Sequence, residues 1–193
     1  AYNYFMVAIF PKSQARILDY NRLIKDLYGY SAKDFLKEVK KKFLVNKINE
    51  SFKPNKPRSF GMYLDGQWYS LRFRGGLDTS KSVIDNLDVN ILMEYLLKPV
   101  LGIVDPRIDP RIDFVGGSRG MVELERGVDS GDWSVAFSLF PVSMRELIKI
   151  ADDKKTFEEL GVRTLMLRFG EAELDNTLSR MEHFASNIKP LVV

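Results

Sequence analysis

Residues 60–73 read FGMYLDGQWYSLRF, which is the clearest local folding signal in the chain. Apolar and aromatic side chains alternate on both sides of the dipeptide Asp65-Gly66. Asp-Gly suits the two central positions of a type I′ turn, because both positions need a positive φ. We therefore predict a β-hairpin with strands over residues 60–64 and 67–73.

The side chains of this hairpin allow two interpretations. Four large side chains could form a ligand platform: Met62, Leu64, Trp68 and Tyr69. We favour an ordinary sheet face, because aromatic and aliphatic residues are what a half-buried strand requires.

The composition of the chain excludes several classes of protein. The 193 residues can bury a core, and the net charge of +3 is too small for a general affinity for nucleic acid. The absence of cysteine excludes disulfides and thiolate chemistry, and it fits a cytoplasmic protein. No apolar run approaches the roughly 20 residues that span a bilayer, so we expect no membrane association.

The start of the chain reads as a buried strand. Residues 4–10 form a continuous apolar run that ends at Pro11. Such a run is typical of a central strand that is covered on both faces. Because the chain begins so close to this strand, we expect it to be a fragment of a larger protein.

Further elements follow from apolar spacing and from turn and capping residues. We predict a strand over 16–20, a turn or helix from Asn21-Arg22, a helix over 32–43 capped by Ser31, a loop over 49–59, a helix over 82–97 ended by Pro99, a strand over 112–115, a helix over 121–126 closed by Gly127, a strand over 133–140 and a helix over 144–151 with Ser143 and Glu146 as a capping box. Together these elements predict an α+β fold with a mixed, mostly antiparallel sheet and flanking helices.

The helix over 32–43 carries a basic face of five lysines, Lys33, Lys37, Lys40, Lys41 and Lys42. Such a face can bind nucleic acid, but no aromatic platform is interleaved with these lysines. We therefore favour a solvated face and do not expect nucleic-acid binding.

Residues 105–120 read DPRIDPRIDFVGGSRG and form the candidate binding corner. Each proline fixes the chain next to an arginine, and the two glycines allow close approach to the backbone. Forked guanidinium groups and a nest of backbone N–H groups are typical of phosphate and carboxylate sites. The predicted phosphate-binding residues are Arg107, Arg111, Gly116, Gly117 and Arg119.

Of the two interpretations of this corner, we favour a structural one. The aspartates could cap turns and pair with the arginines, while the glycines let a strand turn into a helix. A Mg²⁺-bridged phosphate on Asp105, Asp109 and Asp113 is conceivable, but we favour an Asp–Arg network. His183 is the only histidine, so we predict no metal site and assign no catalytic residue.

Over residues 1–153 the chain resembles the C-terminal half of an uncharacterised family, domain of unknown function 1015. The resemblance rests on residues 3–8 (NYFMVA), 17–22 (ILDYNR), 60–66 (FGMYLDG), Leu87-Asp88-Val89 with Pro99, and above all 111–120 (RIDFVGGSRG).

This resemblance implies a nucleotide-linked role. Family members carry an upstream Asp-Gly-His-His-Arg motif similar to that of the ParB and sulfiredoxin-like superfamily, which includes free-serine kinases. The resemblance therefore implies ATP or ADP with Mg²⁺ in the full-length protein. The motif is absent from this chain, so we expect any activity that depends on it to be absent as well.

Two domains are expected, an α+β domain over residues 1–153 and a strand–helix appendage over 154–193. Residues 157–193 are weakly similar to the end of luciferase-like flavin monooxygenases, through Leu160-Gly161-Val162 and residues 181–185 (MEHFA). We favour a generic docking strand and helix for this appendage, and we assign no flavin site to it.

Two hypotheses for function follow. The first is a part of a nucleotide-linked small-molecule enzyme, similar to a serine kinase, with its phosphate site at the corner. The alternative is a non-enzymatic module for homo-oligomerisation or for binding a regulatory partner.

Overall fold

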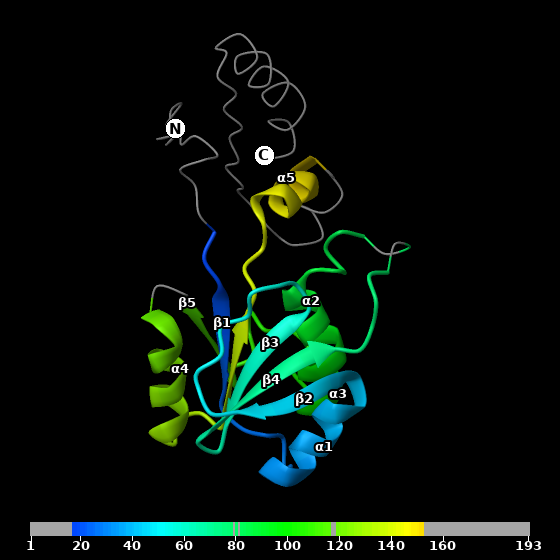
Figure 1. Cartoon of the computed structure of the whole chain (residues 1–193). Coiled ribbons are helices and arrows are strands. Elements are labelled where there is room, and N and C mark those ends of the chain that lie inside the picture. Colours follow the sequence, from blue (N-terminus) through cyan, green and yellow to red (C-terminus); the bar gives the residue numbers. More distant parts are fainter. Residues whose placement is uncertain (1–16, 79, 81, 117–118, 153–193) are drawn as a thin grey trace, which may run out of the picture. The chain divides into compact units, whose positions relative to one another are not determined.

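The computed structural model describes residues 17–78, 80, 82–116 and 119–152 (Figure 1). The chain divides into two units, Leu18–Val142 and a second that includes helix α5 (Met144–Asp152). The predicted strand over 4–10 and the predicted appendage over 154–193 lie outside the described residues. These elements and the boundary at residue 153 stay predictions.

A six-stranded sheet forms the centre of the first unit. Its strands are β1 (Tyr20–Ile24), β2 (Phe43–Ile48), β3 (Ser59–Leu64), β4 (Gln67–Phe73), β5 (Ile112–Gly116) and β6 (Val135–Leu139). Their order in the sheet is β2-β4-β3-β6-β1-β5, and each pairing between described strands is antiparallel. The predicted α+β class with a mostly antiparallel sheet is therefore confirmed.

The β3–β4 hairpin forms as predicted. Asp65 and Gly66 connect the strands with φ angles of 51° and 70°, which fits a type I′ turn. The hairpin is covered on both faces, because Met62 contributes to one apolar cluster and Trp68 to the other. These side chains therefore form ordinary sheet faces rather than an open platform.

Helices cover one face of the sheet along most of its width (Figure 1). They are α1 (Ala32–Lys42), α2 (Asp88–Leu92), the π-helical turn η2 (Met93–Leu97) and α3 (Lys98–Leu101). Fully buried side chains join these helices to the strands, among them Phe35, Phe60, Leu96 and Phe137. This face therefore holds the larger part of the core.

Helix α4 (Gly120–Asp129) packs on the opposite face. Its buried Leu124 belongs to the same cluster as Leu23 of β1. The hairpin reaches α4 with polar atoms, since Tyr63 Oη donates to Asp129 Oδ1 at 2.9 Å. Burial and the hydrogen bond to Asp129 raise the pKa of Tyr63 to about 12, so the phenol stays protonated as a donor.

Two predicted helix caps are confirmed. The Ser31 hydroxyl accepts a hydrogen bond from the Asp34 backbone N–H at 3.1 Å at the start of α1. Ser143 and Glu146 form the predicted capping box of α5: Ser143 Oγ accepts from the Glu146 backbone N–H at 3.1 Å, and Glu146 Oε2 accepts from the Ser143 backbone N–H at 2.8 Å.

The basic face of α1 is exposed in the structure. Two of its lysines pair with carboxylates of the same helix: Lys37 with Asp34 and Lys41 with Glu38, each at 2.7 Å. Such i,i+3 pairs are common on solvated helix faces.

Two strand predictions were wrong. β1 begins at Tyr20 and continues through Asn21 and Arg22, where we predicted a turn or helix, because both neighbouring strands pair with this segment. β2 was missed because we extended the preceding helix to Phe43. Phe43 has extended backbone angles and is fully buried, so tertiary packing starts a strand there.

Two helix predictions were also wrong in their bounds. The helix predicted over 82–97 begins at Asp88, and Pro99 lies inside the following segment, α3, near its first position, where a missing N–H is tolerated. Gly127 does not close α4, which continues to Asp129. A Cβ at Gly127 would lie 3.2 Å from atoms of Leu23 and Trp133, so glycine here permits close packing.

Candidate functional site

Strand β5 divides the predicted binding corner. Arg107 and Arg111 precede β5, whereas Gly116 ends it and Arg119 follows it. The five-residue step from Arg111 to Gly116 spans about 16 Å in an extended strand. The structure therefore does not bring the two groups of predicted residues together, and Gly117 lies outside the described residues.

Arg107 pairs with its own turn. Its Nε and Nη2 donate to Asp105 Oδ1 and Oδ2 at 2.9 and 2.8 Å, and its backbone N–H donates to Oδ1 at 3.0 Å. These hydrogen bonds hold the pKa of Asp105 at about 2. This geometry agrees with the structural interpretation of the Asp-Pro-Arg turns.

Arg111 binds protein groups on all sides. It donates to Asp109 Oδ2 at 2.7 Å and to the backbone carbonyl oxygens of Leu101 at 2.9 Å and Gly102 at 3.3 Å. Its guanidinium also lies 5.4 Å from the centroid of the Tyr28 ring. Arg111 thus joins the turn after β1, the end of α3 and the loop before β5.

The three aspartates at four-residue spacing do not form a metal site. Asp105 and Asp109 each bind an arginine, while Asp113 is exposed on β5. Within the described ranges, no group of three acidic or histidine side chains could hold a metal ion.

Arg22 of β1 is the functional candidate that the sequence did not indicate. Strand alternation places Tyr20 and Arg22 on one face, and Phe114 of β5 pairs with Arg22. The Arg22 guanidinium lies 4.4 Å from the centroid of the Phe114 ring and 4.9 Å from that of Tyr20. The two rings stack on each other at 5.2 Å.

The guanidinium of Arg22 is only partly satisfied. Nη1 donates to the backbone oxygens of Tyr20 at 2.5 Å and Asn21 at 3.3 Å. Within the described part of the chain, Nε and Nη2 donate no hydrogen bond, and no carboxylate lies at ion-pair distance. Burial lowers the pKa of Arg22 to about 10, so the side chain is still charged at neutral pH.

Gly116 and Arg119 follow Phe114 along the chain. Gly116 pairs with Tyr20 across the β1–β5 ladder. Arg119 follows within three residues, hence within about 11 Å of Gly116, and is exposed at the N-terminus of α4. We call Tyr20, Arg22, Phe114, Gly116 and Arg119 the Arg22 site.

Comparison with protein families gives one result. Residues 1–90 match the family described as "Protein of unknown function (DUF1015)". The match confirms the resemblance over this part of the chain, which holds Tyr20, Arg22 and the hairpin. No curated protein matches the chain, and neither does any solved structure.

The DUF1015 match ends at residue 90, so the rest of the Arg22 site lies beyond it. The motif over 111–120, which carries most of the resemblance, lies there too. The similarities to the sulfiredoxin-like and luciferase-like families stay predictions. Among the helices that the structure describes, none is long and apolar enough to cross a membrane.

A buried polar cluster within the matched segment fixes the start of β1. The Asp19 carboxylate accepts from Lys53 Nζ at 2.6 Å and from Asn21 Nδ2 at 2.9 Å. Asn21 Oδ1 in turn accepts from the Leu139 backbone N–H at 3.0 Å. Burial raises the pKa of Asp19, but the hydrogen bonds from Lys53 and Asn21 outweigh it, so the net shift is downward.

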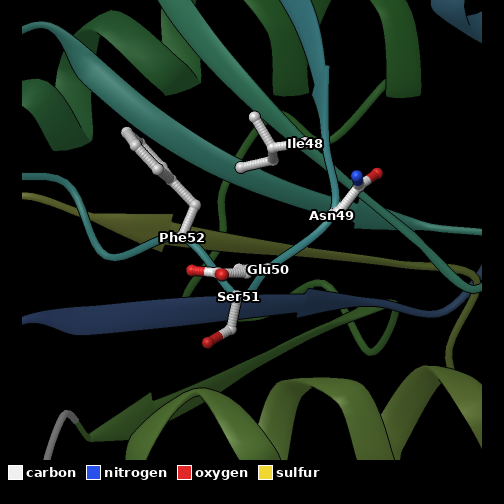
Figure 2. Close-up of a pocket in the computed structure, with 5 residues that line it drawn as sticks. All are labelled: Ile48, Asn49, Glu50, Ser51 and Phe52. Atoms are coloured by element: carbon white, nitrogen blue, oxygen red, sulfur yellow. The ribbon is translucent and has the colours of Figure 1, made fainter.

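The hollow in Figure 2 is a poor alternative for an anionic ligand. It has a volume of about 350 Å³ and is lined by Ile48, Asn49, Glu50, Ser51 and Phe52. Glu50 is its only charged lining residue, and a carboxylate repels anions. The loop that carries this lining is anchored on the sheet, since Ser138 Oγ donates to the Phe52 carbonyl at 2.6 Å.

Proposed function

We propose that this chain binds a nucleotide at the Arg22 site. One observation carries the proposal: Arg22 is a partly buried cation with no carboxylate partner among the described residues. A buried charge is costly unless it is paired and hydrogen-bonded. A phosphate group would supply the missing charge and accept from Nε and Nη2, which form a planar fork suited to it.

The aromatic surroundings favour a nucleotide over free phosphate. Tyr20 is 52% exposed and stacks on Phe114, so a face or edge of its ring is open to a nucleobase. Stacking of a base on an aromatic ring contributes about 1–3 kcal/mol in other proteins. Arg119 is a second cation, which follows Gly116 within three residues at the start of α4.

In the whole protein, this site would belong to a nucleotide-linked small-molecule enzyme, as the family resemblance implies. ATP and ADP with Mg²⁺ are therefore the first ligands to test. Of the residues predicted from sequence, Gly116 and Arg119 keep a role in this proposal, while Arg107 and Arg111 bind their own aspartates.

Calorimetric titration of the 193-residue chain with Mg-ADP, Mg-ATP and inorganic phosphate tests the proposal. We expect saturable binding of a nucleotide and weaker binding of phosphate. A hydrogen bond to a charged group contributes about 1.5–3 kcal/mol, so Arg22→Met should raise Kd roughly tenfold or more.

Arg107→Met is the matched control, because it removes an arginine at the other end of β5. It should leave Kd unchanged. Absence of saturable nucleotide binding would reject the proposal, and so would an equal loss of affinity in the two variants.

A further inference from the structure

Strand β2 forms one edge of the six-stranded sheet (Figure 1). Its middle is open to solvent, because Leu44 is 46% exposed and Asn46 and Lys47 are exposed as well. An uncovered edge strand presents N–H and C=O groups with which another strand can pair. The outer side of β2 can therefore accept a further strand if its backbone groups are free.

The backbone groups of Val45 and Lys47 point away from the sheet. At one end of the ladder between β2 and β4, the Arg74 N–H donates to the Lys42 carbonyl at 3.0 Å. Hydrogen-bonded and non-hydrogen-bonded pairs alternate along an antiparallel ladder, so the even-numbered residues of β2 bond to β4 and the odd-numbered residues point outward. Within the part of the chain that the structure describes, Val45 and Lys47 have no hydrogen-bond partner on that outer side. Each of them thus offers one N–H and one C=O to an incoming strand.

The two faces of β2 differ in their side chains. Val45 packs against the core cluster that contains Phe35 of α1. Side chains alternate along a strand, so Lys47 shares this face, whereas Leu44 and Asn46 lie on the opposite face. An incoming strand would therefore meet a lysine and helix α1 on one face, and an exposed leucine on the other.

The charge of this region selects an acidic partner. Residues 32–48, which form α1 and β2, contain six lysines and two acidic residues and so carry a net charge of +4, whereas the whole chain carries +3. Among the described residues, no carboxylate lies at ion-pair distance from Lys33, Lys40, Lys42 or Lys47. The same charge disfavours pairing of β2 with β2 of a second copy, because like charges would then face each other.

We propose that the outer edge of β2 binds an extended acidic segment of a partner protein, which adds to the sheet as a further strand. Backbone hydrogen bonds to Val45 and Lys47 hold such a segment, and its alternate side chains give specificity. In an antiparallel arrangement, the residues that exchange hydrogen bonds with Val45 and Lys47 point their side chains to the α1 face. Acidic residues belong at these positions, and apolar residues belong beside Leu44. Nucleic acid has no backbone that pairs in this way, so the open edge favours a polypeptide.

Fluorescence anisotropy of a labelled peptide, Glu-Val-Glu-Val-Glu-Val-Glu, tests the proposal on the 193-residue chain. We expect saturable binding that weakens as salt is added, because salt screens the attraction between exposed charges. The same peptide with N-methyl groups on its two central glutamates keeps its charge but cannot donate to β2. We expect this peptide to bind about tenfold more weakly, since two backbone hydrogen bonds are lost.

Variants of the protein separate the charge from the backbone. Lys47→Glu should weaken binding about tenfold, because it places a like charge opposite the acidic side chains. Lys25→Glu is the matched control: Lys25 is exposed and directly follows β1, which lies four strands from β2, or about 19 Å. It should bind the peptide like the natural chain.

A second pair of variants tests the outward N–H of residue 47. Lys47→Gln keeps this donor and removes only the charge. Lys47→Pro also removes the donor, and proline is tolerated in an edge strand where the N–H faces solvent. We expect Lys47→Pro to bind roughly threefold to tenfold more weakly than Lys47→Gln, as the loss of one hydrogen bond predicts.

Four results would each overturn the proposal. They are a natural chain that does not bind the peptide, an N-methylated peptide that binds as tightly as its parent, an equal loss of affinity in Lys47→Glu and Lys25→Glu, and an oligothymidylate that displaces the peptide as well as unlabelled peptide does. The last result would assign this edge to nucleic acid. Circular dichroism of each variant establishes that its fold is intact, and the N-methylated peptide needs no variant. The Arg22 site plays no part in the argument.

Discussion

Arg22 lies beside Phe114 in the middle of strand β5, whereas Arg111 directly precedes that strand, and the two arginines differ in what surrounds them. Both guanidinium groups lie over aromatic rings. Arg111 also binds a carboxylate and two backbone carbonyls, whereas Arg22 binds only carbonyls of its own strand among the described residues. The hydrogen-bond partners of an arginine, rather than its residue type or its motif, therefore distinguish a structural arginine from one that is available to a ligand.

The largest expected effect is the loss of stability in Arg111→Met. This substitution removes the bond to Asp109 and the bonds to the Leu101 and Gly102 carbonyls, and it leaves a largely buried carboxylate without its cation. Because Arg111 keeps some contact with solvent, we expect the free energy of unfolding to fall by about 2 kcal/mol. Urea denaturation measures it. A variant as stable as the natural chain would show that Arg111 is not structural.

The loss of stability in Arg111→Met should depend on pH. The hydrogen bonds from Arg111 lower the pKa of Asp109 below its usual value of 3.8. The stabilisation is therefore present above pH 3.8 and is lost as pH falls through the folded-state pKa. The difference in unfolding free energy between the natural chain and Arg111→Met should shrink in acid. A difference that stayed constant down to the acid transition would contradict the pairing.

The smallest change in the free energy of unfolding is expected for Arg22→Met. Replacing a poorly paired, partly buried cation by an apolar side chain of similar length is often neutral or stabilising. We therefore expect the unfolding free energy to change by less than about 1 kcal/mol, with no dependence on acid pH, because no carboxylate is lost. The same urea titrations measure this. A loss as large as that of Arg111→Met would remove the contrast between the two arginines.

Local chemistry explains what could be predicted from the sequence. The Asp65-Gly66 turn and the Ser31 and Ser143 caps each depend on residues close together in the chain, and all three form as predicted. The sequence did not indicate Arg22 as a binding residue, because its neighbour Phe114 is distant in sequence. It did not indicate the Asp19–Lys53 ion pair either, because these two residues are also far apart in the chain. No local pattern indicates either pair.

The corner over residues 105–120 is the opposite case, in which residues close in sequence lie apart in space. Its residues are contiguous, so they suggested one site, yet the extended strand β5 separates the two Asp-Pro-Arg turns from Gly116 and Arg119. Closeness in sequence becomes distance in space wherever a strand intervenes. The pairing of the arginines with Asp105 and Asp109 was among the alternatives that the sequence left open.

The residue at position 61 determines where the loop over 49–58 can lie. A Cβ at this position would lie 2.2 Å from Ser138 Oγ and 2.6 Å from the Phe52 carbonyl oxygen, so the loop over 49–58 can rest on β3 only because residue 61 has no side chain. A relative with alanine or a larger residue there must take its loop along another path. The identity of this one amino acid would then sort relatives by the route of the loop over 49–58.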